Sequence, residues 1–385
     1  MIVTIIADVL GEANNGTTIA CINLSNALVN HGHTVRIVCP DKDKKGKNNY
    51  FIMPTYTFGP FQRIVDHNQV VLGKAEPLEM SRAIKDADVV HIMMPFMLGR
   101  AGIKIARRFN KPISFGFHCQ AQNVSAHFFN FMEINWINHL IYKNFWNSCY
   151  QYADAIHYPT QFIRTLFENE IHHKTPGYVI SNGVNAIFRP KKVERPKDYE
   201  GKFVILMSGR YSKEKKQILL LKAVAHSKYK DKIKVVLAGG GPKEPTFRKF
   251  AKKHGIDLKL GFYNRNELVD VINTSDLYVH TSTVEIEAIS CLEALSCGLV
   301  PVINNSPNSA TKDFALDERC SFKMDDWKDL VGKIEYWMDH PEEKAELSEK
   351  YKDYAKRFDF DTCMEKMVEM ITEVSKIKII PENEK

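Results

Sequence analysis

Two glutamates, Glu285 and Glu293, stand eight positions apart and are the first candidates for chemistry in the chain. Carboxylates accept hydrogen bonds from hydroxyl groups in pairs. The surrounding pattern predicts a buried strand at Leu277–His280, a turn at 281–284 and a helix from Ile286 to Gly298. Eight positions along a helix span roughly 12 Å, at ~1.5 Å per residue. That spacing suits two parts of one long ligand rather than one metal ion, and two ordinary surface glutamates are the alternative.

A strand that leads into a helix presents free backbone N–H groups and a positive dipole end at the connecting loop, which suits a phosphate. A phosphate flanked by two polyols describes a nucleotide-sugar. Arg210 and Lys215 follow a second expected strand, Phe203–Met207, and two cations on one loop can clamp a diphosphate as it leaves. A solvated basic turn is the competing interpretation of this loop.

These residues resemble the signatures of the family-4 glycosyltransferases. Glu285 and Glu293 are separated by seven residues, and Cys297-Gly298 follows; Gly209-Arg210 is separated from Lys215 by four residues. The resemblance implies a retaining enzyme of the GT-B fold, which is an α/β fold with two Rossmann-like doubly wound domains. In that family the diphosphate leaves with help from the cations, the acceptor hydroxyl attacks from the same face, and no protein nucleophile or metal ion is required.

The resemblance also implies a role for each matching residue. The catalytic set is His118, Arg210, Lys215 and Glu285, where Glu285 orients the donor sugar and His118 follows a strand of the first domain. The donor-binding set contains glycine turns, a loop that holds the base, and the segment around the glutamates: Gly16, Gly209, Gly240, Gly241, Phe262, Ile286, Glu287, Ala288, Ile289 and Glu293. A plain structural role is the alternative for each glycine turn and for the histidine.

One segment departs from the family pattern. Between the paired glutamates the family usually has Pro-Phe-Gly, and this chain has Ile286-Glu287-Ala288. Replacing glycine by alanine narrows the approach of the backbone, and Glu287 adds a negative charge where phosphate and sugar are expected. The identity of the donor sugar is therefore left open, and a UDP-hexose is the expected donor.

Composition limits the class of protein. The chain has 385 residues, 44% of them hydrophobic, which is enough for two domains with their own cores. Eight scattered cysteines without a C-x-x-C pair favour reduced thiols in a cytoplasmic protein. The net charge of +7 permits an anionic partner, but dispersed lysines and the lack of a nucleic-acid motif argue against DNA or RNA. The D-x-D pairs at 41–43 and 359–361 are not expected to bind a metal.

Strands and helices alternate twice along the chain, which predicts two parallel sheets covered by helices. The charged segment 188–199 contains two prolines and is the expected linker. We therefore expect an acceptor-binding domain over 1–190, a nucleotide-sugar-binding domain over 200–360, and a C-terminal helix over 361–385 that returns to the first domain.

The sequence constrains the identity of the acceptor least. Residues 127–152 are rich in Phe, Trp and Tyr, residue types that favour a membrane interface, and lysines 42, 44, 45 and 47 could attract anionic lipid. An aromatic helix packed into the core is the alternative. The segment resembles bacterial transferases that glycosylate diacylglycerol, which favours a lipid acceptor at the inner face of the membrane. A soluble or polyprenyl-linked saccharide is the second acceptor, and a catalytically silent membrane scaffold is the rival of another class.

Overall fold

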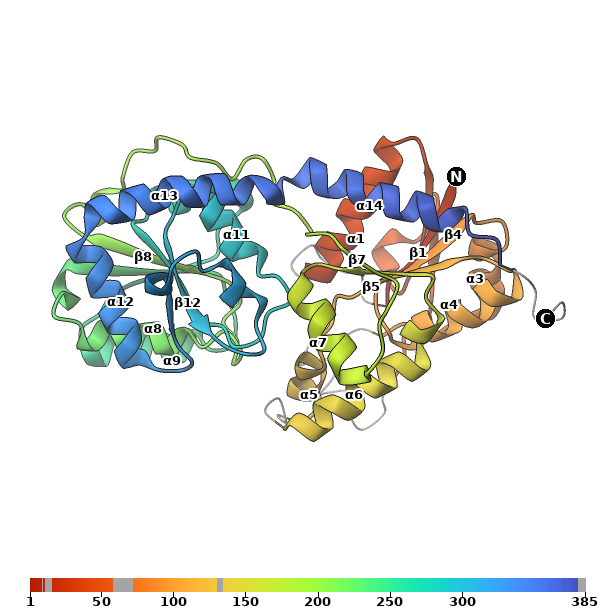
Figure 1. Cartoon of the computed structure of the whole chain (residues 1–385), viewed down its shortest axis with the longest axis horizontal. Helices are drawn as coiled ribbons and strands as arrows, with labels where there is room; N and C mark the ends of the chain where they lie inside the picture. The colour runs from red at the N-terminus through yellow and green to blue at the C-terminus, as the bar shows by residue number, and fades with distance from the viewer. Residues whose placement is uncertain (9, 11–15, 58–71, 130–133, 380–385) are drawn as a thin grey trace. The chain divides into compact units, whose positions relative to one another are not determined.

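Two separate parallel sheets organise the chain in the computed structural model, which describes residues 1–8, 10, 16–57, 72–129 and 134–379 (Figure 1). The first compact unit contains Met1–Asn182 and Thr362–Lys385, and the second contains Gly183–Asp361. Each unit has its own sheet and flanking helices. The predicted α/β fold with two Rossmann-like domains is therefore confirmed.

The first unit has a sheet of seven strands in the order β3-β2-β1-β4-β5-β6-β7, and all its strand pairs are parallel. The strands are β1 Ile2–Ile6, β2 Thr34–Cys39, β3 Tyr50–Ile52, β4 Val89–Ile92, β5 Ile113–Gly116, β6 Ala155–Tyr158 and β7 Gly177–Val179. The helices are α1 Gly16–Asn30, α3 Pro77–Ile84, α4 Met97–Arg108, α5 Ala121–Phe129, α6 Asn135–Ser148, α7 Gln161–Ile171 and α14 Phe360–Ser375.

The second unit has a parallel sheet of six strands in the order β10-β9-β8-β11-β12-β13. The strands are β8 Phe203–Ser208, β9 Ile233–Ala238, β10 Asp257–Gly261, β11 Leu277–His280, β12 Pro301–Asn305 and β13 Ser321–Lys323. The helices are α8 Gln217–His226, α9 Glu244–His254, α10 Arg265–Asn273, α11 Ile289–Ser296, α12 Trp327–Asp339 and α13 Pro341–Ala355.

The central strands are buried on both faces, which explains their nearly continuous apolar sequences. Every residue of β9 is buried, including Lys234, whose ammonium donates to Asp257 Oδ1 at 2.8 Å. Local signals fix the helix starts: Asn264 and Glu267 form a capping box at α10, and the Asp326 carboxylate caps α12. The strands are therefore held rigidly, and the loops at their carboxyl ends are free to carry function.

The helix expected at Ile286–Gly298 is shorter than its sequence pattern indicates. It begins at Ile289 and ends at Ser296, because Glu285 lies in extended backbone that bridges to Ser309 and Ala288 has a φ of 59°. The expected separation of roughly 12 Å along a helix was therefore wrong, since residues 285–288 are not helical and only Glu293 lies within the helix. The short strands β3 and β13, and a 3-10 turn at Lys42–Lys44 in the lysine-rich loop, were not predicted.

The aromatic stretch forms α5 and α6, and residues 130–133, including Phe131 of the expected acceptor segment, lie outside the described residues. In α6 Tyr142 and Phe145 are buried, whereas Trp136 is 65% exposed and Leu140 is 54% exposed. Packing into the core thus accounts for part of the aromatic content and leaves an exposed apolar pair on the first turns of the helix.

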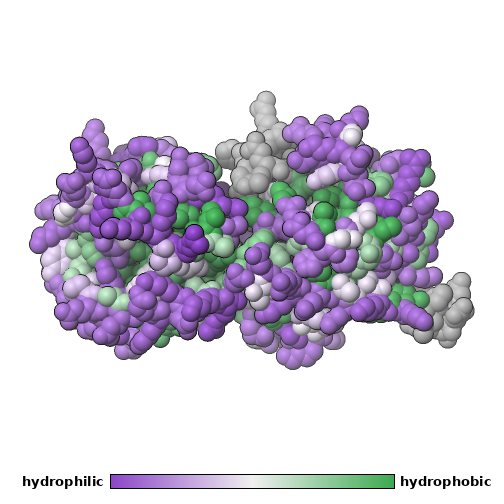
Figure 2. All heavy atoms as spheres, turned by 90° about the horizontal axis from the view of Figure 1, so that it is seen from above, coloured by the Kyte–Doolittle hydropathy of each residue, from purple (hydrophilic) through white to green (hydrophobic). Residues whose placement is uncertain are grey.

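Cysteines and surface hydrophobicity agree with the sequence interpretation. All eight cysteines are buried free thiols. The face in Figure 2 is mostly hydrophilic, with hydrophobic residues in small separate patches. Within the described part of the chain, we find no helix with both the length and the apolar character needed to cross a bilayer.

Candidate functional site

The order in which the chain adds strands to the second sheet reverses between β8 and β11. The chain runs from β8 outward through β9 to β10, and then returns to β11 on the other side of β8. Open α/β sheets bind ligands at the carboxyl ends of the strands at such a switch point. Arg210 and Lys215 follow β8, and Glu285 follows β11, so the topology brings the predicted cations and the first glutamate to the expected place.

Lys215 and Glu285 form an ion pair at this edge, between the Lys215 ammonium and Glu285 Oε1. His280, the last residue of β11, places its Nε2 3.2 Å from the same oxygen. Burial alone raises the pKa of Glu285, but the charge of Lys215 and the contact with His280 outweigh burial and lower the pKa to about 2. Glu285 is therefore an anion at any physiological pH, in a site where its side chain is 11% exposed.

His280 belongs to a buried polar chain beneath the ion pair. Its Nδ1 lies 3.3 Å from the Tyr278 hydroxyl, which is itself 3.3 Å from Ser208 Oγ and 3.4 Å from Ser290 Oγ. Burial lowers the pKa of His280, so the ring is neutral, donates from Nε2 to Glu285 and accepts at Nδ1. These hydrogen-bonded polar side chains were not predicted from the sequence, although a histidine at the carboxyl end of a strand was the available signal.

Hydrogen bonds lock the loop after β8 to the loop after β11. The Thr281 hydroxyl donates to the Lys215 carbonyl at 2.7 Å, and the Thr283 N–H donates to the Glu214 carbonyl at 2.9 Å. Gln217 Nε2 donates to the Arg210 carbonyl at 2.8 Å. The backbone that carries the two predicted cations is consequently fixed before any ligand binds.

Arg210 and Lys215 occupy different environments. The Arg210 side chain is 59% exposed, with Nη2 3.4 Å from Glu214 Oε1, whereas the Lys215 side chain is 18% exposed. The Lys215 ammonium has three donors, and Glu285 Oε1 accepts from one of them. The two predicted cations therefore differ, since Lys215 is held by Glu285 and Arg210 is largely exposed.

Glu293 lies in α11, one to two turns from the helix start, and is half-buried. Burial raises the pKa of its carboxyl group to about 8, and the charge of Arg265 only partly opposes this shift. The two signature glutamates thus differ in charge: Glu285 is ionised by its partners, and Glu293 is protonated at neutral pH. A protonated carboxyl group both donates and accepts, which suits a pair of hydroxyl groups.

The glycine turns hold the backbones of neighbouring loops together. A Cβ on Gly239 would lie 2.1 Å from the Gly209 carbonyl oxygen, and a Cβ on Gly241 would lie 2.8 Å from the Tyr211 carbonyl oxygen. Gly240, by contrast, has open space around it. The sequence interpretation named Gly240 and Gly241, and the close approach identifies Gly239 as the residue that it missed.

Other predicted donor residues of the second unit follow β10 and β11. Phe262 follows β10 and is 81% exposed. Ile289 is the first residue of α11 and packs with Ala288 against the core, while Glu287 is 3% exposed. The extra carboxylate of this chain is thus buried rather than presented to solvent. Ala288 adopts the left-handed conformation that favours glycine, at the position where the family usually has glycine.

In the first unit, His118 follows β5 and lies near two further histidines. Its ring centroid is 5.5 Å from that of His157, and burial together with the charges of His157 and His91 lowers the pKa of His118 well below its ordinary value. A Cβ on Gly116 would lie 2.5 Å from His118 Nε2, so this glycine makes room for the ring. The site therefore presents a neutral imidazole.

Asp8 follows β1 in the first unit. Its carboxylate accepts the N–H groups of Leu98 at 2.8 Å and Gly99 at 3.1 Å, at the start of α4. Burial nevertheless raises the pKa of Asp8 to about 7. Gly16 is exposed as the first residue of α1. Among the residues that the structure describes, no three His, Cys, Asp or Glu side chains gather in a group that could hold a metal ion.

Two Rossmann-like units, with a charged site at the switch point of the second, form the architecture of the GT-B fold. The model of Glycosyltransferase Family 4 matches residues 14–187, and the model of Glycosyl transferases group 1 matches residues 188–358. The chain belongs to the family-4 glycosyltransferases of the GT-B fold, as its sequence motifs predicted.

Individual relatives agree with this assignment. The alpha-monoglucosyldiacylglycerol synthases of Streptococcus pneumoniae and Acholeplasma laidlawii are 26% and 25% identical, over 76% and 75% of this chain and 68% and 76% of theirs. A crystal structure of Anabaena Alr3699/HepE in complex with UDP has a TM-score of 0.74 and 14% identity, and the match covers 97% of this chain and 99% of that one. The latter likeness supports the fold.

Proposed function

We propose that this protein is a retaining glycosyltransferase that moves a hexose, most simply glucose, from a UDP-sugar to a lipid hydroxyl such as that of diacylglycerol. The observation that carries the proposal is the Lys215–Glu285–His280 arrangement at the switch point of the second unit. The two synthases that match most of the chain support glucose and diacylglycerol as reactants, because their names describe that product.

In this mechanism the two cations, Glu285 and Glu293 act on three different parts of the donor. Arg210 and Lys215 bind the diphosphate and stabilise its charge as the bond to the sugar breaks. Glu285 accepts hydrogen bonds from the sugar hydroxyls, and the protonated Glu293 binds the ribose. Backbone N–H groups at the start of α11 provide further donors to phosphate. The second unit is thus the donor-binding domain in this proposal.

The acceptor role belongs to the first unit. His118 is held neutral, so it can donate a hydrogen bond to an incoming hydroxyl or accept one from it. Trp136 and Leu140 expose apolar surface on α6, which suits a peripheral position at a membrane interface. The lysines near residue 45 can add attraction to anionic lipid. We accordingly place the protein at the cytoplasmic face of the membrane.

The test is a panel of UDP-glucose, UDP-galactose and GDP-mannose, each with diacylglycerol vesicles, sterol vesicles or a soluble sugar. We expect the largest transfer from UDP-glucose to diacylglycerol, with the α configuration of the donor retained when the product is analysed by NMR. An inverted product would contradict the retaining mechanism. Efficient transfer to the soluble sugar alone would exclude the lipid acceptor and leave the glycosyltransferase assignment intact.

Membrane binding is tested by sedimentation with vesicles. Replacing Trp136 and Leu140 by serine should reduce binding, whereas Leu78→Ser is a matched control because Leu78 is 62% exposed on another helix, α3. Equal binding by both variants would show that the exposed pair on α6 does not contact lipid.

A further inference from the structure

The second unit has a pocket at the edge opposite to the candidate active site. Asp276 and Val300, which immediately precede β11 and β12, line it, so it lies at the amino ends of the strands, whereas Lys215 and Glu285 lie beyond their carboxyl ends. Its volume is about 480 Å³, which is within the range of small-ligand sites. Nothing in the proposed transfer reaction uses this pocket.

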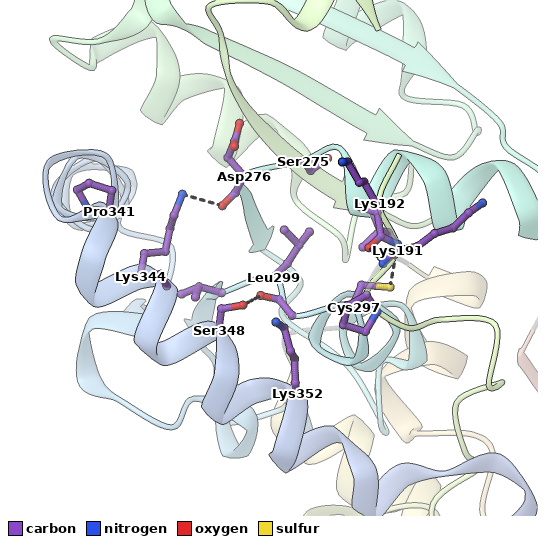
Figure 3. Close-up of a pocket in the computed structure, with 16 residues that line it drawn as sticks. Lys191, Lys192, Ser275, Asp276, Cys297, Leu299, Pro341, Lys344, Ser348 and Lys352 are labelled. Carbon is purple, nitrogen blue, oxygen red and sulfur yellow. Dashed lines mark hydrogen bonds between the residues drawn. The ribbon is translucent and has the colours of Figure 1, made fainter. Parts of the chain in front are cut away.

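The pocket is lined by an excess of positive charge (Figure 3). Lys344, Ser348 and Lys352 lie four residues apart on α13 and so share one face of the helix. Lys191 and Lys192 line it from the segment that precedes β8. Four lysines thus accompany a single acidic lining residue, Asp276.

The charge of Asp276 is already used by other partners. Its two carboxylate oxygens accept from Arg195 at 3.1 and 2.9 Å, and Oδ2 also accepts the Val204 N–H at 2.8 Å. Lys344 instead donates to the Asp276 backbone carbonyl at 3.2 Å and lies 4.5 Å from the centre of the Phe203 ring. No carboxylate among the described residues forms an ion pair with Lys344, and burial lowers the pKa of this lysine.

Two of the other lining lysines form ion pairs that a ligand could displace. Lys191 pairs with Asp270 and Lys352 pairs with Glu349, and the side chains of Asp270 and Glu349 are 47% and 72% exposed. Exposed ion pairs of this kind contribute little to stability, so a bound anion can take the place of the carboxylate beside each lysine. Lysine ammonium groups act as compact point charges that suit phosphate.

We propose that this pocket binds a small soluble molecule that carries phosphate groups, with Lys344 and Lys352 as its principal ligands. The backbones of the two residues lie roughly 12 Å apart along the helix, and their long, flexible side chains can converge on a diphosphate or contact two separated phosphates. Bound there, the anion joins α13 to the segment that contains Lys191 and Lys192. This proposal is independent of the donor and acceptor assigned above.

Inorganic pyrophosphate is the probe, titrated calorimetrically into the full chain carrying Lys215→Ala, which weakens the competing phosphate site. Adding Lys344→Gln and Lys352→Gln should weaken binding at least tenfold, or about 1.4 kcal/mol. Lys350→Gln is the matched control, because Lys350 is exposed on the same helix and does not line the pocket. It should leave the affinity unchanged.

Lys192→Gln serves as a second variant if the double substitution impairs folding, since Lys192 is an exposed side chain, and it should weaken binding by a few-fold. The proposal is overturned if pyrophosphate affinity is unchanged in the pocket variants, or if Lys350→Gln weakens binding equally. Phosphatidic acid vesicles distinguish a lipid headgroup from a soluble ligand: lysine-dependent binding to vesicles without binding of pyrophosphate would also overturn it.

Discussion

At the carboxyl ends of the strands of the second unit, Lys215 and Glu285 form an ion pair, and Lys215 and His280 lower the pKa of Glu285 to about 2. At the same edge of the first unit, burial keeps His118 neutral and raises the pKa of Asp8 to about 7. Both edges belong to parallel sheets of the same type, so the difference comes from the loops. Fixed charge suits the binding of a diphosphate, whereas neutral donors and acceptors suit an uncharged hydroxyl group.

The strongest test of this comparison is removal of the fixed cation. Lys215→Ala should lower kcat/KM by about 3 kcal/mol of transition-state stabilisation, as loss of one preorganised donor does elsewhere, and Arg210→Ala should have an effect of the same order. Lys222→Ala is the control, since Lys222 is exposed on α8. Steady-state kinetics with the UDP-sugar gives the measurement, and near-normal turnover in both variants would refute the clamp.

Lys215→Ala also leaves Glu285 partly buried without its cation, which should lower the free energy of unfolding. The double variant Lys215→Ala, Glu285→Gln removes that uncompensated charge. It should recover stability in denaturant unfolding while remaining inactive, and this separates catalytic charge from structural charge. Recovery of activity in the double variant would show that the pair is structural.

A smaller effect is expected from His280, which acts through Glu285 and is thus a positioning residue. His280→Leu should lower kcat about tenfold with little change in KM, and His280→Gln should restore part of it, because an amide N–H can still donate. Loss of the donor should raise the pKa of Glu285. The reaction requires the Glu285 carboxylate, which forms only above the pKa of this group. The acid limb of the pH–rate profile should therefore move to higher pH in His280→Leu. An unchanged limb would contradict this role.

Glu293 is the exception to fixed charge in the second unit, and its effect should appear in stability. Its folded-state pKa of about 8 exceeds the ordinary value of 4.5, so the folded chain holds an extra proton between these limits. The contribution of this proton to the free energy of unfolding is complete below pH 4.5 and is lost as the pH rises through 8. Glu293→Gln should therefore reduce the fall in thermal stability between pH 5 and 8.

Glu346→Gln, an exposed substitution on α13, is the control for this pH series and should retain the fall. Glu293→Gln should also preserve donor affinity better than Glu293→Ala, which should mainly raise the donor KM because ribose contacts persist through the reaction. If Glu293→Ala lowers kcat and leaves KM unchanged, the assigned roles of Glu285 and Glu293 are reversed.

The sequence predicted the two sheets and the loops that carry the charged residues, but not the contact between His280 and Glu285. Alternating apolar runs were enough to predict two parallel sheets, and Arg210, Lys215 and Glu285 were placed by their position after strands. The contact of His280 with Glu285 depends on the extended course of residues 281–285, which follows from pairing with Ser309 far along the chain. The local helical periodicity contains no information on that pairing. The sequence therefore predicted the start of α11 three residues too early.

Ala288 provides the smallest test and the one most closely tied to that local error. Its φ of 59° costs an ordinary residue about 1 kcal/mol, and glycine adopts it freely, so Ala288→Gly should leave stability unchanged or raise it by a fraction of that amount. Ala294→Gly, within α11 and buried, should instead lower the free energy of unfolding by about 1 kcal/mol or more. Denaturant unfolding of the two variants measures the contrast. Equal losses would show that Ala288 is not strained, and the family's preference for glycine at this position would then need an explanation in ligand binding rather than in backbone geometry.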